Sequence, residues 1–273
     1  MLQLKLVAVL LLVGLVPSGL STVQRGAAPA LSGVEGPAAA VRAVDAANAF
    51  LATKISFINE IADLCEKVGA DVQEVARGIG LDNRIGSKFL HAGPGYGGSC
   101  FPKDASALIK TAHDHGSSVR ILETVVAIND QRKRAMARKI TAALGTPIRG
   151  KIVAILGLTF KPNTDDMREA PSIALITALL DLGMTVRAYD PAGMDQAKIV
   201  LPDIAYCDGP YSAAEKAHAL AIVTEWEQFR ALDLNRLKQI MASPIIIDLR
   251  NIYQPEELRK AGFIYDGVGR PNS

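Results

Sequence analysis

The chain reads Gly150-Lys151-Ile152-Val153-Ala154-Ile155-Leu156-Gly157 at the point where its hydrophobic pattern changes. The short apolar run at residues 152–156, between these glycines, predicts a buried strand. Similar runs occupy residues 185–189, 219–224 and 245–247, and helical patterns follow such runs at residues 171–182 and 255–261. Because strand and helix alternate from residue 150 on, we expect a doubly wound parallel α/β sheet that collects ligands beyond the carboxyl ends of its strands.

A helical section precedes this sheet. Between residues 46 and 69, apolar residues recur at three- and four-residue steps, which predicts an amphipathic helix. Asp71 is placed to cap a second helix, and further helices follow Pro102 and span about residues 117–143. Amphipathic helices of this length pack against each other or against another subunit. We therefore expect residues 46–149 to form an all-helical section with a dimer interface.

The first 45 residues fit neither pattern. An apolar run at residues 6–16 follows Lys5 and is too short to span a bilayer. It has the build of a secretory signal, but the next residues are rich in Ala, Gly and Pro and offer no convincing cleavage site. We expect residues 1–45 to be either a signal-like leader or a lead that belongs to no fold.

The composition argues against several classes of protein. The 273 residues carry 30 Lys and Arg against 28 Asp and Glu, so a surface that coats nucleic acid has no electrostatic support. Three cysteines without a Cys-x-x-Cys pair argue against a disulfide framework and a zinc site, and the four histidines lack ligand spacing. We expect no metal, no nucleic acid, no membrane partner beyond the leader, and a reducing, cytoplasmic location.

Cys100 is the strongest chemical candidate. It follows a glycine-rich loop and precedes a helix expected to begin near Pro102, where free amides and the helix dipole favour a thiolate. Asp104 lies one turn further on the same face, where it can accept a proton, and Lys103 adds a cation. The alternative is a buried, inert cysteine after a flexible turn, which is the state expected of Cys65 and Cys207.

The turn after the first strand contains no dinucleotide-binding fingerprint. Residues 157–162 lack the spacing Gly-x-Gly-x-x-Gly, and the chain holds no Walker sequence. Three cations, Lys161, Arg168 and Arg250, follow strands at positions where an α/β sheet collects anions. Arg84 lies in a loop between helices and is either a solvated or a phosphate-binding residue.

Three motifs carry a resemblance to a known family: residues 47–60, Gly97-Gly98-Ser99-Cys100-Phe101-Pro102-Lys103-Asp104, and residues 157–162 with 165–169. They closely resemble the UDP-glucose/GDP-mannose dehydrogenase family, and the resemblance extends over residues 46–271. Phe101 after the cysteine is similar to the branch of the family that oxidises UDP-glucose. The resemblance implies a central helical dimerisation domain over residues 46–149 and a UDP-sugar-binding domain over residues 150–273.

The reaction implied by the resemblance is the oxidation of UDP-glucose to UDP-glucuronate, with NAD as the cofactor. Cys100 would attack the C6 aldehyde to form a thiohemiacetal, and water would hydrolyse the thioester left by a second oxidation. Asp104 would position that water, and Asn48 would hold the oxyanion. Lys103 and Arg168 would contact NAD. The implied substrate contacts are Phe89, Leu90, His91, Ala92, Gly93, Gly97, Phe160, Lys161 and Arg250, with Arg84 reaching the substrate of a neighbouring subunit.

Two departures from the family change what we expect of this chain. The family has an NAD-binding domain ahead of the helical section, where this chain has unrelated residues, and a catalytic lysine where this chain has Val44. Loss of such a cation costs about 3 kcal/mol of oxyanion stabilisation. We expect a truncated dehydrogenase without turnover on its own. The alternatives are a remnant that binds the nucleotide sugar or dimerises without turnover, and a dehydrogenase of GDP-mannose or an N-acetylated sugar.

Overall fold

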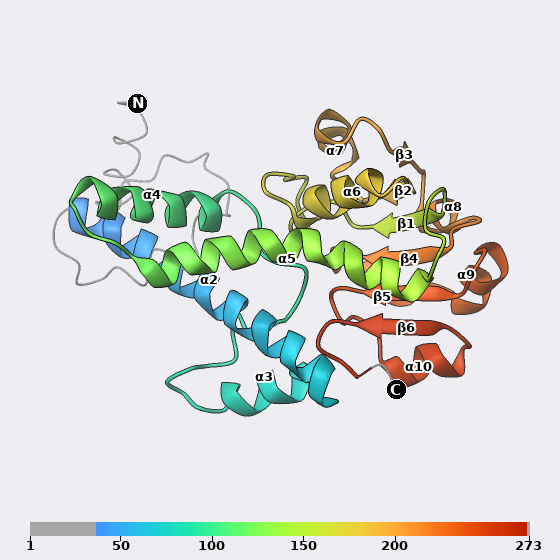
Figure 1. Cartoon of the computed structure of the whole chain (residues 1–273), viewed down its shortest axis with the longest axis horizontal. Coiled ribbons are helices and arrows are strands. Elements are labelled where there is room, and N and C mark those ends of the chain that lie inside the picture. The colour runs from blue at the N-terminus through green and yellow to red at the C-terminus, as the bar shows by residue number, and fades with distance from the viewer. Residues whose placement is uncertain (1–36, 272–273) are drawn as a thin grey trace, which may run out of the picture.

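The computed structural model describes residues 37–271, with side chains from residue 43 on (Figure 1). Of the leader expected at residues 1–45, residues 1–36 lie outside the described residues. Residues 37–45 form the first turns of α2, so the helix expected from residue 46 begins earlier. Among the described residues, no helix is both long enough and apolar enough to cross a bilayer.

The helices ahead of the sheet are α2 (Pro37–Val68), α3 (Val72–Gly80), α4 (Cys100–Asp114) and α5 (Arg120–Leu144). α2 buries Ile58 and Ala62 completely and ends at Gly69, whose φ of 76° is a left-handed value that favours glycine. Asp71 caps α3 by accepting a hydrogen bond from the backbone N–H of Gln73 (2.7 Å). α2 packs against both α4 and α5, so the expectation that these helices contact one another is confirmed.

The described residues after α5 form a six-stranded parallel sheet. Its strands are β1 (Ile152–Leu156), β2 (Thr185–Tyr189), β3 (Ala205–Tyr206), β4 (Ala219–Ile222), β5 (Ile245–Asp248) and β6 (Ile264–Gly267). The connecting elements are α6 (Pro171–Asp181), α7 (Met194–Val200), α8 (Pro210–Ala214), η3 (Glu227–Ala231), α9 (Leu234–Ile240) and α10 (Pro255–Lys260). The strand order β3-β2-β1-β4-β5-β6 is that of a Rossmann-like fold and confirms the doubly wound prediction.

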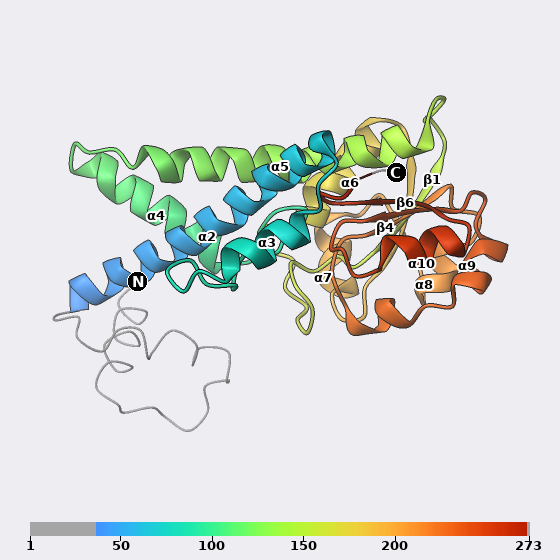
Figure 2. The same cartoon turned by 90° about the horizontal axis from the view of Figure 1, so that it is seen from below.

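The two faces of the sheet are covered by different helices (Figure 2). Val153 and Ile155 of β1 face a core shared with α5 and α6. Ala154 and Leu156 face a second core shared with α8, α9 and α10. All four side chains have an exposed fraction of 0%, as expected for a central parallel strand with both faces covered. The C-terminal half of α5 thus covers the sheet, although this helix begins far from it.

Some strand limits differ from the sequence-based expectation. β4 ends at Ile222 rather than at Thr224, because Thr224 leaves the ladder and donates its hydroxyl to the backbone carbonyl of Thr159. β3 and β6 were not predicted. They form the two edges of the sheet. β3 contains only two residues and β6 ends in Asp266 and Gly267, so neither presents the continuous apolar run that predicted the other strands.

The shared core predicts that the helical section and the sheet unfold together. Ile140 of α5 is fully buried, so Ile140→Ala should lower the free energy of unfolding by about 2–5 kcal/mol. As the control, Ile199→Ala on α7, where the side chain is 74% exposed, should change it by less than about 0.5 kcal/mol. Urea unfolding followed by circular dichroism and by Trp226 fluorescence checks both, and separate transitions for the two signals would contradict the shared core.

Candidate active site

The glycine-rich loop between α3 and α4 is held in place by buried polar side chains. Asn59 of α2 accepts a hydrogen bond from the backbone N–H of Gly93 (2.9 Å), and Arg132 of α5 donates to the carbonyl of the same residue (2.7 Å). Asn129 pairs with both backbone groups of Tyr96, at 2.9 and 3.1 Å. Because these partners lie on packed helices, the loop is fixed rather than flexible.

The glycines let this loop approach the sheet closely. A Cβ atom at Gly97 would collide with the carbonyl oxygen of Glu169, and one at Gly98 would lie 2.7 Å from the ring of Phe160. The backbone N–H of Gly98 donates to the carbonyl of Arg168 (2.8 Å). Any larger side chain at Gly97 or Gly98 would push the loop away from the turn that follows β1.

Cys100 is the first residue of α4 and is exposed. The helix begins two residues before the expected start, and its N-cap, Ser99, makes no side-chain capping bond. Free amides and the positive end of the helix dipole therefore lie at the residue that carries the thiol. Cys65 and Cys207 are buried, and burial raises the pKa of both thiols. The contrast expected between Cys100 and the other two cysteines is present.

Asp104 and Asn48 contact each other. Asp104 is 6% exposed, and its Oδ2 accepts a hydrogen bond from Nδ2 of Asn48 on α2 (2.6 Å). Lys103 Nζ lies 3.2 Å from the other carboxylate oxygen. Burial and the negative charge of Asp104 raise the pKa of the neighbouring Asp45. Val44 stands one helical turn before Asn48 and supplies no charge to this group.

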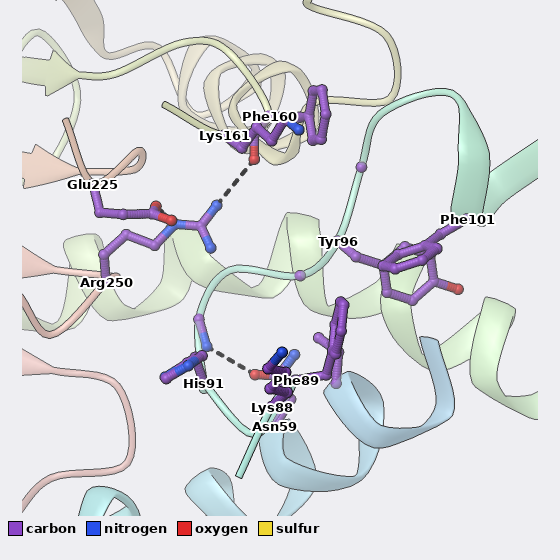
Figure 3. Close-up of a pocket in the computed structure, with 14 residues that line it drawn as sticks. Asn59, Lys88, Phe89, His91, Tyr96, Phe101, Phe160, Lys161, Glu225 and Arg250 are labelled. Carbon is purple, nitrogen blue, oxygen red and sulfur yellow. Dashed lines mark hydrogen bonds and ion pairs between the residues drawn. The ribbon is translucent and has the colours of Figure 1, made fainter. Parts of the chain in front are cut away.

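A cavity of about 370 Å³ lies between the glycine-rich loop and the carboxyl ends of the strands (Figure 3). Three cations and one carboxylate line it: Lys88, Lys161, Arg250 and Glu225. The other lining residues are Ile55, Asn59, Phe89, His91, Gly93, Gly95, Tyr96, Gly97, Phe101 and Phe160. Its volume is typical of a site for a small ligand, and its excess of positive charge favours an anionic one.

Arg250, which follows β5, is held by groups that follow β4 and β1. Its Nε donates to the carbonyl of Val223 (2.7 Å) and lies 3.0 Å from Oε2 of Glu225. One terminal nitrogen donates to the carbonyl of Phe160 (3.3 Å). With its side chain 17% exposed, the guanidinium keeps one edge toward the cavity, as Figure 3 shows.

Aromatic rings connect the cavity with the start of α4. The ring of Phe101 lies 5.9 Å from those of Phe89 and Tyr96, both edge to face. Phe89 has a φ of 64°, a strained value for a bulky residue that is typical of functional sites. Burial raises the pKa of Tyr96 to about 12, so its hydroxyl stays neutral at physiological pH. Because Phe101 follows Cys100 directly in the sequence, this aromatic cluster connects the lining of the cavity with the start of α4.

The structure brings most of the predicted substrate residues together, but not all of them. Phe89, His91, Gly93, Gly97, Phe160, Lys161 and Arg250 line one cavity. The side chains of Leu90 and Ala92 are buried in the hydrophobic core instead, which leaves their backbone groups for contacts. Arg84 lies outside the cavity, with 89% of its side chain exposed and an ion pair to Asp82 (2.6 Å).

Several residues of the site were not predicted from the sequence. Asn59, Asn129 and Arg132 interrupt the apolar faces of α2 and α5, and a polar side chain at a buried helical position is the signal that would have found them. Glu225 follows the end of β4, where an α/β sheet is expected to gather ligands. No local signal singles out Tyr96, whose position depends on Asn129 across 33 residues.

The turn after β1, where the strand order of the sheet reverses, does not fit a dinucleotide. The backbone N–H groups of Leu158 and Thr159, which would face a pyrophosphate after β1, are already bound by the carboxylate of Asp190 (2.7 and 3.1 Å). Lys103 and Arg168 do fit an anionic group near the thiol, since their side chains are 75% and 69% exposed. Within residues 37–271, no three His, Cys, Asp or Glu side chains converge to hold a metal ion.

The fold and the site together define a Rossmann-like α/β protein with a cationic cavity and an exposed thiol at the N-terminus of α4. Residues 40–131 match the central domain of the UDP-glucose/GDP-mannose dehydrogenase family, and residues 154–255 match its UDP binding domain. The chain belongs to this family.

Individual relatives give the extent of the match. The chain is 63% identical over 227 residues to UDP-glucose 6-dehydrogenase of Rhizobium meliloti (strain 1021), covering 83% of this chain and 52% of the relative. It is 46% identical to UDP-glucose 6-dehydrogenase TuaD of Bacillus subtilis (strain 168), covering 83% and 49%. The solved UDP-glucose dehydrogenase of Pyrobaculum islandicum is similar with a TM-score of 0.75 and 34% identity, covering 91% and 57%. The chain thus spans about half the length of the curated relatives it matches.

The exposure of the three cysteines predicts selective alkylation. Cys100 is exposed, whereas Cys65 and Cys207 are 3% and 8% exposed and carry thiols whose pKa is raised by burial. At pH 8, iodoacetamide should add to Cys100 first, at least about tenfold faster than to the other two. Peptide mass spectrometry over time checks this, and Cys100→Ser should remove the fast phase. Equal labelling of Cys65 would contradict the assignment.

Proposed function

We propose that this chain carries the nucleotide-sugar site and the catalytic thiol of a UDP-glucose 6-dehydrogenase, which converts UDP-glucose to UDP-glucuronate. The observation that carries the proposal is the cationic cavity between Lys161 and Arg250, whose wall includes Phe101, the neighbour of Cys100. The names of the similar proteins from Rhizobium meliloti and Bacillus subtilis support UDP-glucose as the nucleotide sugar.

The substrate contacts follow from the lining of the cavity. Lys161 and Arg250 would bind the diphosphate, because cations with several donors suit phosphate oxygens. His91, Gly93 and Gly97 would offer backbone groups of the loop that α2 and α5 hold in place. Since this loop is fixed before binding, little conformational entropy is lost when the ligand enters. Arg84, which is exposed and does not line this cavity, would reach the substrate of a neighbouring subunit.

The chemistry belongs to Cys100 and Asp104 in the first turns of α4 and to Asn48 of α2. The thiolate of Cys100 would attack the C6 aldehyde, forming the carbon–sulfur bond while the carbonyl oxygen becomes an oxyanion. Asn48 uses one N–H for Asp104, so its second N–H is free to bind that oxyanion. After oxidation to the thioester, Asp104 would orient a water toward the acyl carbon, and breaking of the carbon–sulfur bond would regenerate the thiolate.

NAD, when bound, supplies the acceptor for the hydrides of both oxidations. Lys103 and Arg168 would contact its phosphates, since both are exposed cations. The turn after β1 would take no part in binding NAD, because Asp190 already accepts hydrogen bonds from its backbone N–H groups. NAD chemistry and three free thiols both suit a reducing compartment, and we place this function in the cytoplasm.

Binding without turnover is the second candidate function of this chain. Val44 occupies the position where the resemblance implies a catalytic lysine, so the oxyanion would lose a cation worth about 3 kcal/mol. Val44 does not line the cavity, so the loss of the lysine should not weaken binding of the nucleotide sugar. The chain would then hold the nucleotide sugar at full affinity while oxidising it slowly or not at all.

Calorimetric titration of the purified chain tests whether its nucleotide-sugar ligand is UDP-glucose or GDP-mannose. UDP-glucose should bind in the absence of NAD and should compete with UDP but not with GDP-mannose. Arg250→Gln should weaken binding by about 30-fold, because a charged hydrogen-bonding partner of the diphosphate is lost. Arg236→Gln, on the distant helix α9, is the matched control and should leave the affinity unchanged. A wild-type chain that binds no UDP-glucose, or prefers GDP-mannose, would refute the proposal.

The partner that we propose for the helical section is a second copy of the chain. Phe50, Phe57 and Leu64 are spaced by seven residues along α2 and are 66%, 49% and 53% exposed. Val68, one turn beyond Leu64, is 67% exposed. A continuous exposed apolar stripe on a long helix is typical of a subunit interface rather than of a solvated surface.

Replacing the middle of this stripe by a charge should break the dimer. Phe57→Asp should shift the chain from dimer to monomer in sedimentation velocity, because an unpaired carboxylate would be buried at the interface. Ile199→Asp, an exposed apolar position on α7 (74%), is the control and should leave the association state unchanged. A wild-type chain that sediments as a monomer at micromolar concentration would rule out this interface.

A further inference from the structure

Asp190 is a buried carboxylate with an unusual number of hydrogen-bond donors around it. It follows β2 directly and is 1% exposed. Its Oδ2 accepts from Leu158 N (2.7 Å), Thr159 N (3.1 Å), Thr159 Oγ1 (3.2 Å) and Trp226 Nε1 (3.1 Å). Its Oδ1 accepts from Ala192 N (2.9 Å) and Gly193 N (2.7 Å). All these donors are electrically neutral groups: backbone amides, a hydroxyl and an indole.

These donors come from three separate connections of the sheet. Leu158 and Thr159 belong to the turn after β1, Ala192 and Gly193 precede α7, and Trp226 follows β4. One carboxylate therefore ties together the carboxyl ends of three neighbouring strands. A charged acceptor strengthens each hydrogen bond relative to a neutral one, so this junction is among the most constrained points of the sheet.

The junction leads directly into the nucleotide-sugar cavity. Thr159 precedes Phe160 and Lys161, both of which line the cavity. The hydroxyl of Thr224 donates to the carbonyl of Thr159, and the carbonyl of Phe160 accepts from Arg250. A displacement of the turn at Thr159 would therefore move Lys161 and remove one of the contacts that orient Arg250.

We infer that Asp190 is a positioning residue of the proposed site, whose buried carboxylate fixes the turn after β1 and thereby sets Lys161 and Arg250 at the spacing that a diphosphate requires. It touches no ligand itself. The inference rests on the proposed function for the identity of the ligand. The fixing of the turn can also be measured without any ligand.

Even an amide of the same size cannot replace this carboxylate. In Asp190→Asn, one oxygen remains, and the NH2 group must face either Leu158, Thr159 and Trp226 or the two N–H groups of Ala192 and Gly193. In both orientations, donors point at donors. Asp190→Ala removes the carboxylate and leaves a small cavity lined by those N–H groups, which formate is small enough to enter.

The test compares Asp190→Asn and Asp190→Ala with the control Asp195→Asn, whose carboxylate is 93% exposed and pairs with Lys198 at the surface. UDP-glucose affinity is measured by calorimetry, and hydrogen exchange of residues 157–161 is followed by mass spectrometry without ligand. Trp226, the one tryptophan of the chain, reports directly on the junction by its fluorescence. Formate is added to each variant, with chloride at equal ionic strength as the reference.

We expect both Asp190 variants to bind UDP-glucose about tenfold more weakly and to exchange residues 157–161 faster, with Asp195→Asn unchanged. Formate, and not chloride, should restore the affinity and the Trp226 emission of Asp190→Ala, which a general loss of stability would not allow. Unchanged affinity and exchange in Asp190→Asn, or absence of formate rescue, would overturn the inference.

Two results keep the inference separate from the proposed function and from a failure to fold. If the wild-type chain binds no UDP-glucose, the proposed function fails, while exchange and fluorescence still decide whether Asp190 fixes the turn. If neither variant folds, hydrogen exchange of the wild-type chain tests the inference. The amides of Leu158 and Thr159 should then exchange as slowly as those of β1, and rapid exchange would overturn the inference.

Discussion

The burial of α5 against the sheet is the contact on which the geometry of the site depends. Met136, Ala137 and Ile140 fix the C-terminal half of this helix in the core, while Asn129 and Arg132, earlier on the helix, hold the backbone of the glycine-rich loop. Burial of such side chains contributes more free energy than the net gain of each hydrogen bond. The apolar contact therefore fixes the helix, and the helix in turn fixes the loop that borders the cavity.

Much of the fold could be predicted because its signals are local. The runs that became β1 and β2 were predicted to the residue, since a buried strand between turn residues needs no distant information. The exposed position of Cys100 at a helix start likewise follows from a glycine-rich stretch before a helical pattern. The roles of Asn48 and Asp104 were implied by the family motifs, and the structure places the two side chains in hydrogen-bond contact.

The remaining features depend on pairs of residues that lie far apart in the sequence. Asn48 meets Asp104 across 56 residues, and Gly93 meets Asn59 across 34. No periodicity encodes such pairs. The same limit explains why the loop looked flexible from its glycines, since its clamps come from α2 and α5. It also explains why the hydrogen bonds of Asp190 could not be predicted, because its donors come from three separate strand connections.

The unbroken course of α5 also bears on motion between the two walls of the cavity. This helix runs without interruption from Arg120 to Leu144, from its contacts with α2 and α4 to the face of the sheet, so no hinge separates the two walls of the cavity. Rotating one wall against the other would expose fully buried side chains such as Ile140. Moving these two walls apart would therefore cost the burial of this shared core, which disfavours a hinge motion within the described residues.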